Sequence, residues 1–407
     1  MTKAPTLELN EKMYEIEGET AFSFLALARE MESRGRRVIS FGIGQPDYPT
    51  PSHIREAAKR ALDEGFTGYT ETAGIPELRE AIAEYLNDRY GADVRPDEIV
   101  VTTGAKTAVF LALAAYVKPG DEVIIPEPSY YAYAQVVKLF GGRPVFVPMT
   151  FEPGYGFKID ISSIEEVVSN KTRAIVLNNP HNPTGSIFTA DQVDSLMELA
   201  RRRNLVIVAD EIYDNFVFHG TEFKSVLTYS DWRDYVAYIN GFSKTFSMTG
   251  WRLGYVVVRR EVIPRIIDLA VTVYSCAPSF AQKAAVEALR GDWTPVREMI
   301  QEFQERAKIL HSILDRAPGI ESYLPQGAFY MFPRVSGLLK ALGVDADRMV
   351  RMLLEDKGVL VLPGRAFPDK AGLEHIRISF ATSRENIIEG ARLIVEFAEE
   401  AMSSQKK

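Results

Sequence analysis

The sequence contains few cysteines, few histidines and no excess of basic residues. Its 407 residues include a single cysteine, so no disulfide can form within the chain. The five histidines lack the paired spacing of a zinc site, and we expect no metal centre. The formal net charge is −8 at pH 7. Because phosphate binding needs a basic surface, this charge argues against a nucleic-acid partner.

Long hydrophobic runs are also missing. No continuous apolar stretch is long enough to span a bilayer, and the N-terminal segment MTKAPTLELNEKMYEIEGE carries charges where a signal peptide would be apolar. We therefore expect a cytoplasmic protein with small-molecule ligands and no membrane partner. Hydrophobic residues still make up 46% of the chain, which is enough for a large core, and the length favours two or more domains.

Seven short apolar runs between about residues 50 and 290 predict a mainly parallel β-sheet. Most are continuous, which is typical of strands covered by helices on both faces. Amphipathic helical patterns alternate with them, as expected for the crossover units of an α/β fold. The runs are EIVVTT (98–103), EVIIP (122–126), RPVFVP (143–148), RAIVLN (173–178), LVIVAD (205–210), VAYIN (236–240) and GYVVV (254–258).

The pattern changes after residue 290. A charged helix is predicted over about 296–316, and short strands follow in GAFYMF (327–332), GVLVLP (358–363) and HIRISFA (375–381). This predicts a smaller α+β domain, to which we also assign an N-terminal helix (22–35) and strand (37–44). The expected divisions are an arm and part of the small domain over 1–49, a large domain over 50–290, and a small C-terminal domain over 291–407.

In a doubly wound sheet, ligands bind at the carboxyl ends of the strands, so the residues after each run are candidates. Gly104, Ala105 and Lys106 follow the first run and open an apolar helix, whose free N–H groups can hold an anion. A lysine at a helix N-terminus opposes the helix dipole, and a bound anion would reverse that cost. A simple turn is the alternative interpretation of these three residues.

Further strand ends carry aromatic, amide and carboxyl groups. Tyr130 and Tyr131 follow the second run and offer either packing or a flat face for a ring. Asn182 lies in the turn-forming segment NNPHNPTG (178–185). Asp210 ends an apolar strand, where a buried carboxylate needs a cation or a protonated nitrogen. A helix cap or a structural salt bridge is the alternative role for Asp210.

The segment GFSKTFSMTGWRLGY (241–255) places Lys244 in the turn after a strand, with Ser243 and Arg252 available to an anion. One ligand would use all of these groups, namely pyridoxal phosphate. Its aldehyde needs a lysine, its pyridine nitrogen needs a carboxylate, its phosphate needs N–H groups and an arginine, and its ring needs a stacking face.

These motifs resemble the class I aminotransferases, which have fold type I of the pyridoxal-phosphate enzymes. The resemblance extends over nearly the whole chain. The motifs that carry it are GIGQPD (42–47), Tyr69, GIPELR (74–79), NPHNPTG (179–185), DEIY (210–213), SKT (243–245), GWRLG (250–254) and Arg377 in HIRISFA.

The resemblance implies a role for each matching residue. Lys244 is expected to form a Schiff base with the cofactor and to transfer the substrate proton, and Asp210 to pair with the pyridinium nitrogen. Asn182 and Tyr213 would hydrogen-bond the phenolic oxygen, and Tyr130 would stack on the ring, although Tyr131 and Tyr133 compete for the tyrosine roles. The implied catalytic set is Lys244, Asp210 and Tyr213.

The remaining implied roles concern anionic groups. The phosphate would be bound by Ser243, Arg252 and the 104–106 turn, and Tyr69 would reach it from the partner subunit of a homodimer with shared active sites. Arg377 would bind the substrate α-carboxylate bidentately, with Asn182 and the Gly44 backbone assisting.

A lysine at the position of Lys106 is associated, in a bacterial and archaeal subgroup of the family, with dicarboxylic substrates. The resemblance therefore implies transfer of the amino group of aspartate to 2-oxoglutarate, with the cofactor carrying the group between two half-reactions. The same chemistry on alanine or aromatic amino acids, or a C–S lyase on the same fold, stays open. A transcription regulator is disfavoured, because the chain has no room for a DNA-binding module and no basic charge.

Overall fold

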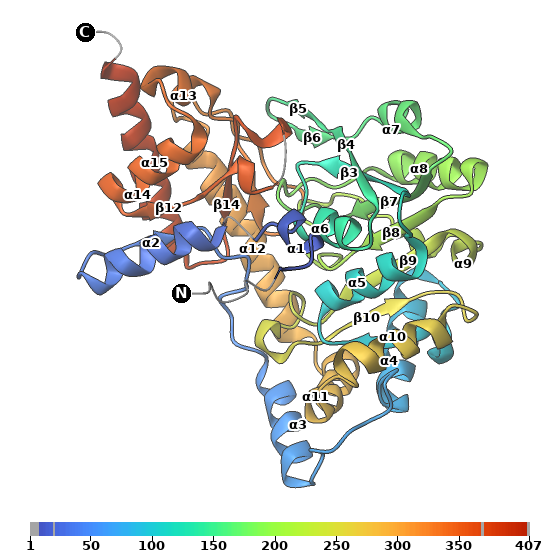
Figure 1. Cartoon of the computed structure of the whole chain (residues 1–407). Coiled ribbons are helices and arrows are strands. Elements are labelled where there is room, and N and C mark those ends of the chain that lie inside the picture. The colour runs from blue at the N-terminus through green and yellow to red at the C-terminus, as the bar shows by residue number, and fades with distance from the viewer. Residues whose placement is uncertain (1–7, 19–20, 368–369, 405–407) are drawn as a thin grey trace, which may run out of the picture.

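A seven-stranded β-sheet forms the centre of the larger part of the chain (Figure 1). The computed structural model describes residues 8–18, 21–367 and 370–404. The strand order is β2-β10-β9-β8-β7-β3-β4, and β10 alone runs against its neighbours, so the predicted mainly parallel sheet is confirmed. The strands are β2 (Ile99–Thr102), β3 (Glu122–Glu127), β4 (Arg143–Pro148), β7 (Thr172–Asn178), β8 (Val206–Asp210), β9 (Val236–Gly241) and β10 (Gly254–Val257).

Helices cover both faces of this sheet. Alternate strand residues such as Val100 and Val208 are buried on one face with α5, α6 and α10, whereas Ile99 and Ile207 are buried on the other with α4, α8 and α11. The double coverage explains why the strands are apolar without alternation. These helices are α4 (Pro76–Tyr90), α5 (Ala105–Tyr116), α6 (Ala132–Leu139), α8 (Ala190–Arg203), α10 (Ile263–Tyr274) and α11 (Ser279–Arg290).

Local signals in the sequence set the ends of these helices. Helix α8 begins with a capping box between Thr189 and Gln192 and ends at Asn204 in the left-handed conformation. Helix α4 has proline in its first turn and ends at Gly91, which also has positive φ. Five further helices precede the short strands of the C-terminal part or connect the elements of the large sheet. They are α1 (Lys12–Glu15), α3 (Ser52–Asp63), α7 (Ile161–Val167), α9 (Trp232–Tyr235) and α12 (Thr294–Leu314).

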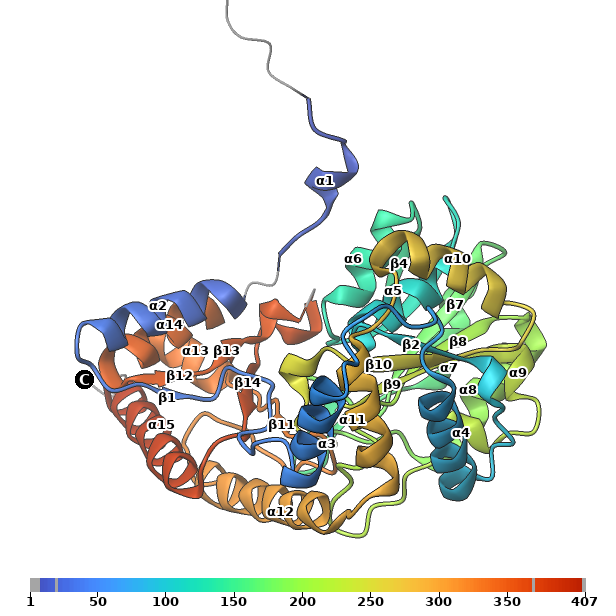
Figure 2. The ribbon, with the colours of Figure 1, turned by 90° about the horizontal axis from the view of Figure 1, so that it is seen from below.

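A second group of short strands lies beside the large sheet and joins the two ends of the chain (Figure 2). Strand β1 (Ile39–Ser40) pairs in parallel with β12 (Val359–Leu360), and α2 (Ala21–Ser33) contacts β12. The remaining elements are β11 (Tyr330–Met331), β14 (Ile376–Ser379) and β13 (Leu362–Pro363), which form one sheet in that order, with α13 (Ser336–Leu342), α14 (Ala346–Lys357) and α15 (Arg384–Ser404).

Several small strands are shorter than the sequence suggested. The expected strand over 37–44 keeps two residues, because the carbonyl groups of Gly42 and Gly44 accept hydrogen bonds from side chains of other elements instead of from a neighbouring strand. The expected strand over 327–332 is reduced to β11, and 358–363 divides into β12 and β13, which belong to different sheets. The hairpin of β5 (Thr150–Glu152) and β6 (Gly156–Lys158) was not expected.

A membrane-spanning helix does not occur within the residues that the structure describes, since none of their helices combines sufficient length with sufficient apolarity.

Candidate active site

The carboxyl ends of the parallel strands meet at one edge of the large sheet and line a cavity of about 430 Å³. This volume lies in the range of small-molecule sites, about 300–1,000 Å³. The loop at 42–45 and two residues of the small strands, Tyr330 and Arg377, close the cavity from the other side. The cavity therefore lies where the large sheet and the second group of strands meet.

The charges on the cavity wall are unequal. Four cationic side chains line it, those of Lys106, Lys244, Arg252 and Arg377, together with one carboxyl group, that of Asp210. Such a wall favours a ligand with more than one negative charge, because its cationic groups outnumber its carboxyl groups.

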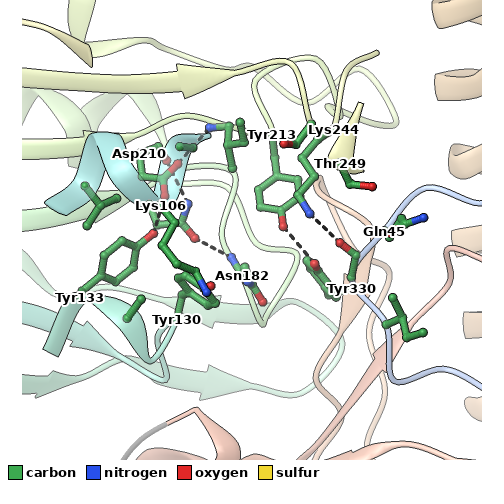
Figure 3. Close-up of a pocket in the computed structure, with 18 of the residues that line it drawn as sticks. Gln45, Lys106, Tyr130, Tyr133, Asn182, Asp210, Tyr213, Lys244, Thr249 and Tyr330 are labelled. Atoms are coloured by element: carbon green, nitrogen blue, oxygen red, sulfur yellow. Dashed lines mark hydrogen bonds between the residues drawn. The ribbon is translucent and has the colours of Figure 1, made fainter. Parts of the chain in front are cut away.

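Asp210 is the last residue of β8 and is 6% exposed. Its Oδ2 accepts a 2.7 Å hydrogen bond from the hydroxyl of Tyr133, and its Oδ1 accepts one of 3.2 Å from the backbone N–H of Ile212 (Figure 3). Burial raises the pKa of the Asp210 carboxyl to about 6, although both hydrogen bonds and the charge of Lys244 oppose the rise. A protonated nitrogen in the cavity would be a suitable partner for this carboxyl group.

Lys244 lies in the turn that follows β9, and its neighbour Ser243 also lines the cavity. The Lys244 Nζ donates a 2.5 Å hydrogen bond to the carbonyl oxygen of Gly44 (Figure 3). It lies 5.8 Å from the centre of the Tyr213 ring. The amine is thus held in the cavity by a neutral acceptor and an aromatic ring.

The start of α5 faces Arg252. Gly104 precedes the helix with a φ of +96°, and a Cβ atom there would lie 2.5 Å from the Arg252 Nη2. The positive φ favours glycine here, and any side chain at this position would have to displace the guanidinium group. Ala105 and Lys106, the first two residues of α5, line the cavity together with Arg252. The helix N-terminus and the arginine therefore lie side by side, as the predicted anion site requires.

Arg377 is buried in β14 without a carboxylate partner among the described residues. Its Nη2 donates to the Gly42 carbonyl at 2.7 Å, its Nη1 lies 3.4 Å from the Asn182 Oδ1, and its Nε has no partner in the structure. The guanidinium also lies over the Tyr330 ring, 4.6 Å from its centre. A buried guanidinium with an open donor is suited to a carboxylate ligand.

Two tyrosines close the cavity beneath Lys244. The hydroxyl groups of Tyr213 and Tyr330 lie 2.9 Å apart, and both residues are buried (Figure 3). Tyr330 was not among the predicted site residues. One feature of the sequence could have indicated it. Tyr330 lies among the apolar residues of GAFYMF, where a tyrosine brings a hydroxyl group into a buried strand.

Tyr130 and Lys106 lie at the rim of the cavity. The Lys106 Nζ is 3.1 Å from the hydroxyl of Tyr131. It lies 5.5 Å from the centre of the Tyr130 ring (Figure 3). Lys106 is exposed and has no ion pair within the described part of the chain. Its charge is therefore available to a ligand that enters the cavity.

Tyr69 is the one predicted site residue that lies away from the cavity. It is 91% exposed and does not contribute to the cavity wall of this chain. The other predicted residues, Gly44, Gly104, Ala105, Lys106, Tyr130, Asn182, Asp210, Tyr213, Ser243, Lys244, Arg252 and Arg377, lie in the cavity wall or, for Gly104, in direct contact with it.

Comparison with known proteins identifies the family. Residues 36–394 match the model for aminotransferase class I and II. The chain belongs to this family. An aspartate aminotransferase from Sulfurisphaera tokodaii is 48% identical over 95% of this chain and 97% of its own. The predictions of an aminotransferase and of fold type I are therefore confirmed.

Solved structures agree with this assignment. The aspartate aminotransferase from Thermus thermophilus with maleate has a TM-score of 0.90 and 33% identity, covering 96% of this chain and 100% of its own. The aromatic aminotransferase from Pyrococcus horikoshii OT3 has a TM-score of 0.85 and 36% identity, covering 94% and 99%.

Enzymes of this family depend on pyridoxal 5′-phosphate, as predicted for this chain. The cavity fits that cofactor on three counts. The start of α5 and Arg252, which line the cavity together, can hold a phosphate. The raised pKa of Asp210 suits a carboxyl group that shares a proton with a ring nitrogen, and Lys244 provides the amine. When bound, this cofactor withdraws electrons from the α-carbon of the substrate and carries the amino group between half-reactions.

Proposed function

We propose that this aminotransferase moves the amino group of L-aspartate to 2-oxoglutarate. The supporting observation is that two cations without ion pairs among the described residues, buried Arg377 and exposed Lys106, line one cavity with Lys244. A dicarboxylic amino acid offers one carboxylate to each. Arg377, assisted by Asn182 and the Gly44 backbone, would bind the α-carboxylate, and Lys106 would bind the distal one.

Each neighbouring group in the wall has a corresponding role in this proposal. Asp210 would pair with the pyridinium nitrogen, Tyr213 and Asn182 would hydrogen-bond the phenolic oxygen, and Tyr130 would stack on the ring. The amine of Lys244 would remove the proton from the substrate α-carbon and return it during the transfer. Ser243, Arg252 and the 104–106 turn would bind the phosphate.

We further propose that the protein acts as a homodimer in the cytoplasm. Tyr69, which is almost fully exposed in one chain, would reach the phosphate bound by the partner subunit. Exposed apolar side chains of α10, those of Val271 and Val273, are suited to the same contact between subunits. We also propose that each chain is divided into three parts. These are an arm with part of the small domain over 1–49, a large cofactor-binding domain over 50–290 and a small C-terminal domain over 291–407.

The half-reaction tests this function directly. The purified protein, loaded with cofactor, is given L-aspartate without any oxo acid, and its visible absorption and the released oxaloacetate are measured. One equivalent of oxaloacetate per active site, together with a change in the cofactor absorption, is expected. An absorption that aspartate leaves unchanged but another amino acid changes would reject aspartate and retain an aminotransferase.

An aromatic amino donor is the second candidate. The rim carries Tyr130 and Tyr131, and one of the similar structures is an aromatic aminotransferase. Against this, the similar Thermus structure contains maleate, a dicarboxylate. A panel of aspartate, alanine, phenylalanine and tyrosine, compared by kcat/KM, separates these candidates. Release of pyruvate and ammonia from a cysteine-type substrate would instead indicate a lyase.

A further inference from the structure

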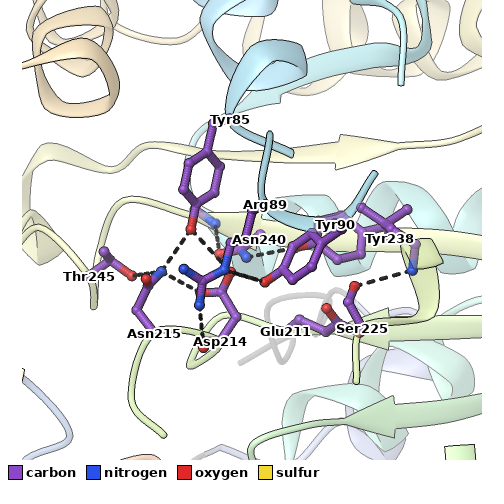
Figure 4. Close-up of polar contacts among 12 residues, drawn as sticks. Tyr85, Arg89, Tyr90, Glu211, Asp214, Asn215, Ser225, Tyr238, Asn240 and Thr245 are labelled. Atoms are coloured by element: carbon purple, nitrogen blue, oxygen red, sulfur yellow. Dashed lines mark hydrogen bonds and ion pairs between the residues drawn. The ribbon is translucent and has the colours of Figure 1, made fainter. Parts of the chain in front are cut away.

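The segment that follows β8 has two different sides. Asp210 and Tyr213 line the cavity, whereas Glu211 and Asp214 do not. Both of the latter are fully or almost fully buried, and Figure 4 shows them among polar side chains. Glu211 accepts a 2.9 Å hydrogen bond from the backbone N–H of Val226. Two carboxyl groups buried behind an active site are costly unless they bind specific partners.

Asp214 receives its partners from α4. The hydroxyl of Tyr90 donates to Asp214 Oδ2 at 2.8 Å, and the hydroxyl of Tyr85 lies 3.4 Å from the same oxygen. The Arg89 Nε lies 4.0 Å from this oxygen, and the Arg89 Nη2 donates to the Asp214 carbonyl at 3.0 Å. Burial raises the pKa of Asp214, and the charge of Arg89 opposes that rise. Three residues of one helix therefore fix a single loop residue.

Asn215 extends these contacts to the lysine turn. Its Nδ2 lies 2.8 Å from the Asp214 Oδ1, 2.9 Å from the Tyr85 hydroxyl and 3.3 Å from the Oγ1 of Thr245 (Figure 4). Thr245 follows Lys244 directly and is buried. The amide of Asn215 thus joins the segment that carries Tyr213, the turn that carries Lys244, and α4.

We propose that Asp214 and Asn215 are positioning residues, which use Arg89, Tyr85 and Tyr90 of α4 as an anchor to fix Tyr213 and Lys244 in the cavity. Neither residue lines the cavity, so neither touches the reacting atoms. Misplacement of a reacting group by a fraction of an ångström slows catalysis strongly, whereas it changes substrate binding at Arg377 little. The proposal rests on the role proposed for Lys244, but not on the identity of the amino donor.

Thr245→Val tests the proposal in the cofactor-loaded protein, because it removes the acceptor Oγ1 and preserves the shape of the side chain. We expect kcat to fall about five- to tenfold with KM within about twofold. We also expect a shift of about half a pH unit in the midpoint of the pH-dependent visible absorption, which reports the surroundings of Lys244 and needs no substrate. Thr245→Ser, which keeps the hydroxyl group, should restore both values.

Thr172→Val is the matched control, because Thr172 is also buried and its Oγ1 accepts one backbone hydrogen bond, from Ser169, outside the cavity wall. It should change thermal stability without changing kcat or the absorption midpoint. If Thr245→Val behaves like this control, the network has a structural role alone and the proposal is wrong.

Asn215→Ala provides the second variant. If Asn215 and Thr245 act through one hydrogen bond, the double variant Asn215→Ala/Thr245→Val should lose no more kcat than the more damaging single variant. A loss equal to the product of the two single losses would contradict the proposed link between the two residues. All variants are assayed with the donor that the wild-type protein uses best. Failure of the aspartate assignment therefore leaves this comparison intact.

Discussion

The hydroxyl of Tyr133 donates a 2.7 Å hydrogen bond to the Oδ2 of Asp210, from the first turn of α6 to the end of β8. This bond favours the ionised carboxyl in a place where burial favours the neutral one. The balance leaves the carboxyl with a pKa of about 6, above its ordinary value of 3.8. The position of Asp210 and that of Lys244 each lead to a prediction.

The first concerns stability without cofactor. Because the pKa of Asp210 is higher in the folded protein than in the unfolded chain, its contribution to the free energy of unfolding is greatest below about pH 3.8 and is lost as the pH rises to about 6. Asp210→Asn cannot ionise, so at pH 8 we expect it to raise the free energy of unfolding of the cofactor-free protein by up to about 3 kcal/mol.

Urea unfolding at pH 8 and at pH 4 checks this prediction. At pH 4, where the wild-type carboxyl is mostly protonated in the folded state, the difference between variant and wild type should shrink. In the loaded enzyme the same substitution removes the carboxyl group that we propose as the partner of the pyridinium nitrogen, and kcat should fall by at least about 100-fold. An equal stability of the two proteins at both pH values would show that burial does not raise the pKa of Asp210 in the folded protein.

The lysine itself gives the second prediction. Lys244→Ala should lower turnover by at least about 1,000-fold and leave the far-ultraviolet circular dichroism unchanged, because the side chain makes one hydrogen bond in a turn already fixed by its neighbours. Lys244→Arg is the control that keeps a cation near the Gly44 carbonyl without a suitable amine, and it should be equally inactive. Normal turnover in either variant would reject the central assignment.

The sequence predicted most of the large sheet and 11 of the 22 residues that line the cavity. The run VAYIN (236–240) agrees with β9 to within one residue, because burial on both faces requires continuous apolar residues. Part of the site followed from the rule that polar residues after parallel strands meet at one edge, whereas Gly44, Tyr69 and Arg377 came from the family resemblance alone. Lys244 and Asp210 are 34 positions apart in sequence but line the same cavity for this reason.

Other parts of the site could not be predicted because they depend on packing between distant segments. Tyr130, Tyr131 and Tyr133 are close in sequence, and only the orientation of α6 against β8 decides that Tyr133 bonds Asp210. The lengths of the short strands were predicted wrongly for a similar reason. The 42–44 backbone looks like a strand, but its carbonyls bind Arg377 and Lys244, which come from other parts of the fold.

Substrate choice can be tested at Lys106. Lys106→Ala should lower kcat/KM for aspartate by about 10- to 100-fold, as expected for loss of one charge-assisted hydrogen bond, and should leave kcat/KM for alanine within about twofold. Cofactor binding, measured by absorption, is the control for damage to the start of α5. If the variant still binds cofactor and its kcat/KM for aspartate is unchanged, Lys106 does not bind the distal carboxylate.

The buried arginine should behave differently from Lys106. Arg377→Lys keeps a positive charge but loses the planar pair of donors, so kcat/KM should fall by about 10- to 100-fold for every amino donor, alanine included. Comparison of the two variants on aspartate and alanine therefore separates the α-carboxylate site from the distal one. Equal losses for both donors in Lys106→Ala would place Lys106 in cofactor binding instead.

The exposure of Tyr69 leads to a test of shared active sites. If Tyr69 completes the site of the partner subunit, a dimer of one Tyr69→Ala chain and one Lys244→Ala chain contains one site with both defects and one intact site. Mixing the two inactive variants, after partial unfolding and refolding together, should restore about a quarter of the wild-type activity. A tyrosine that serves its own chain would give no intact site and no recovery. Refolding each variant alone, with no gain in activity, is the control, so recovery in the mixture alone would establish that the two chains build the site together.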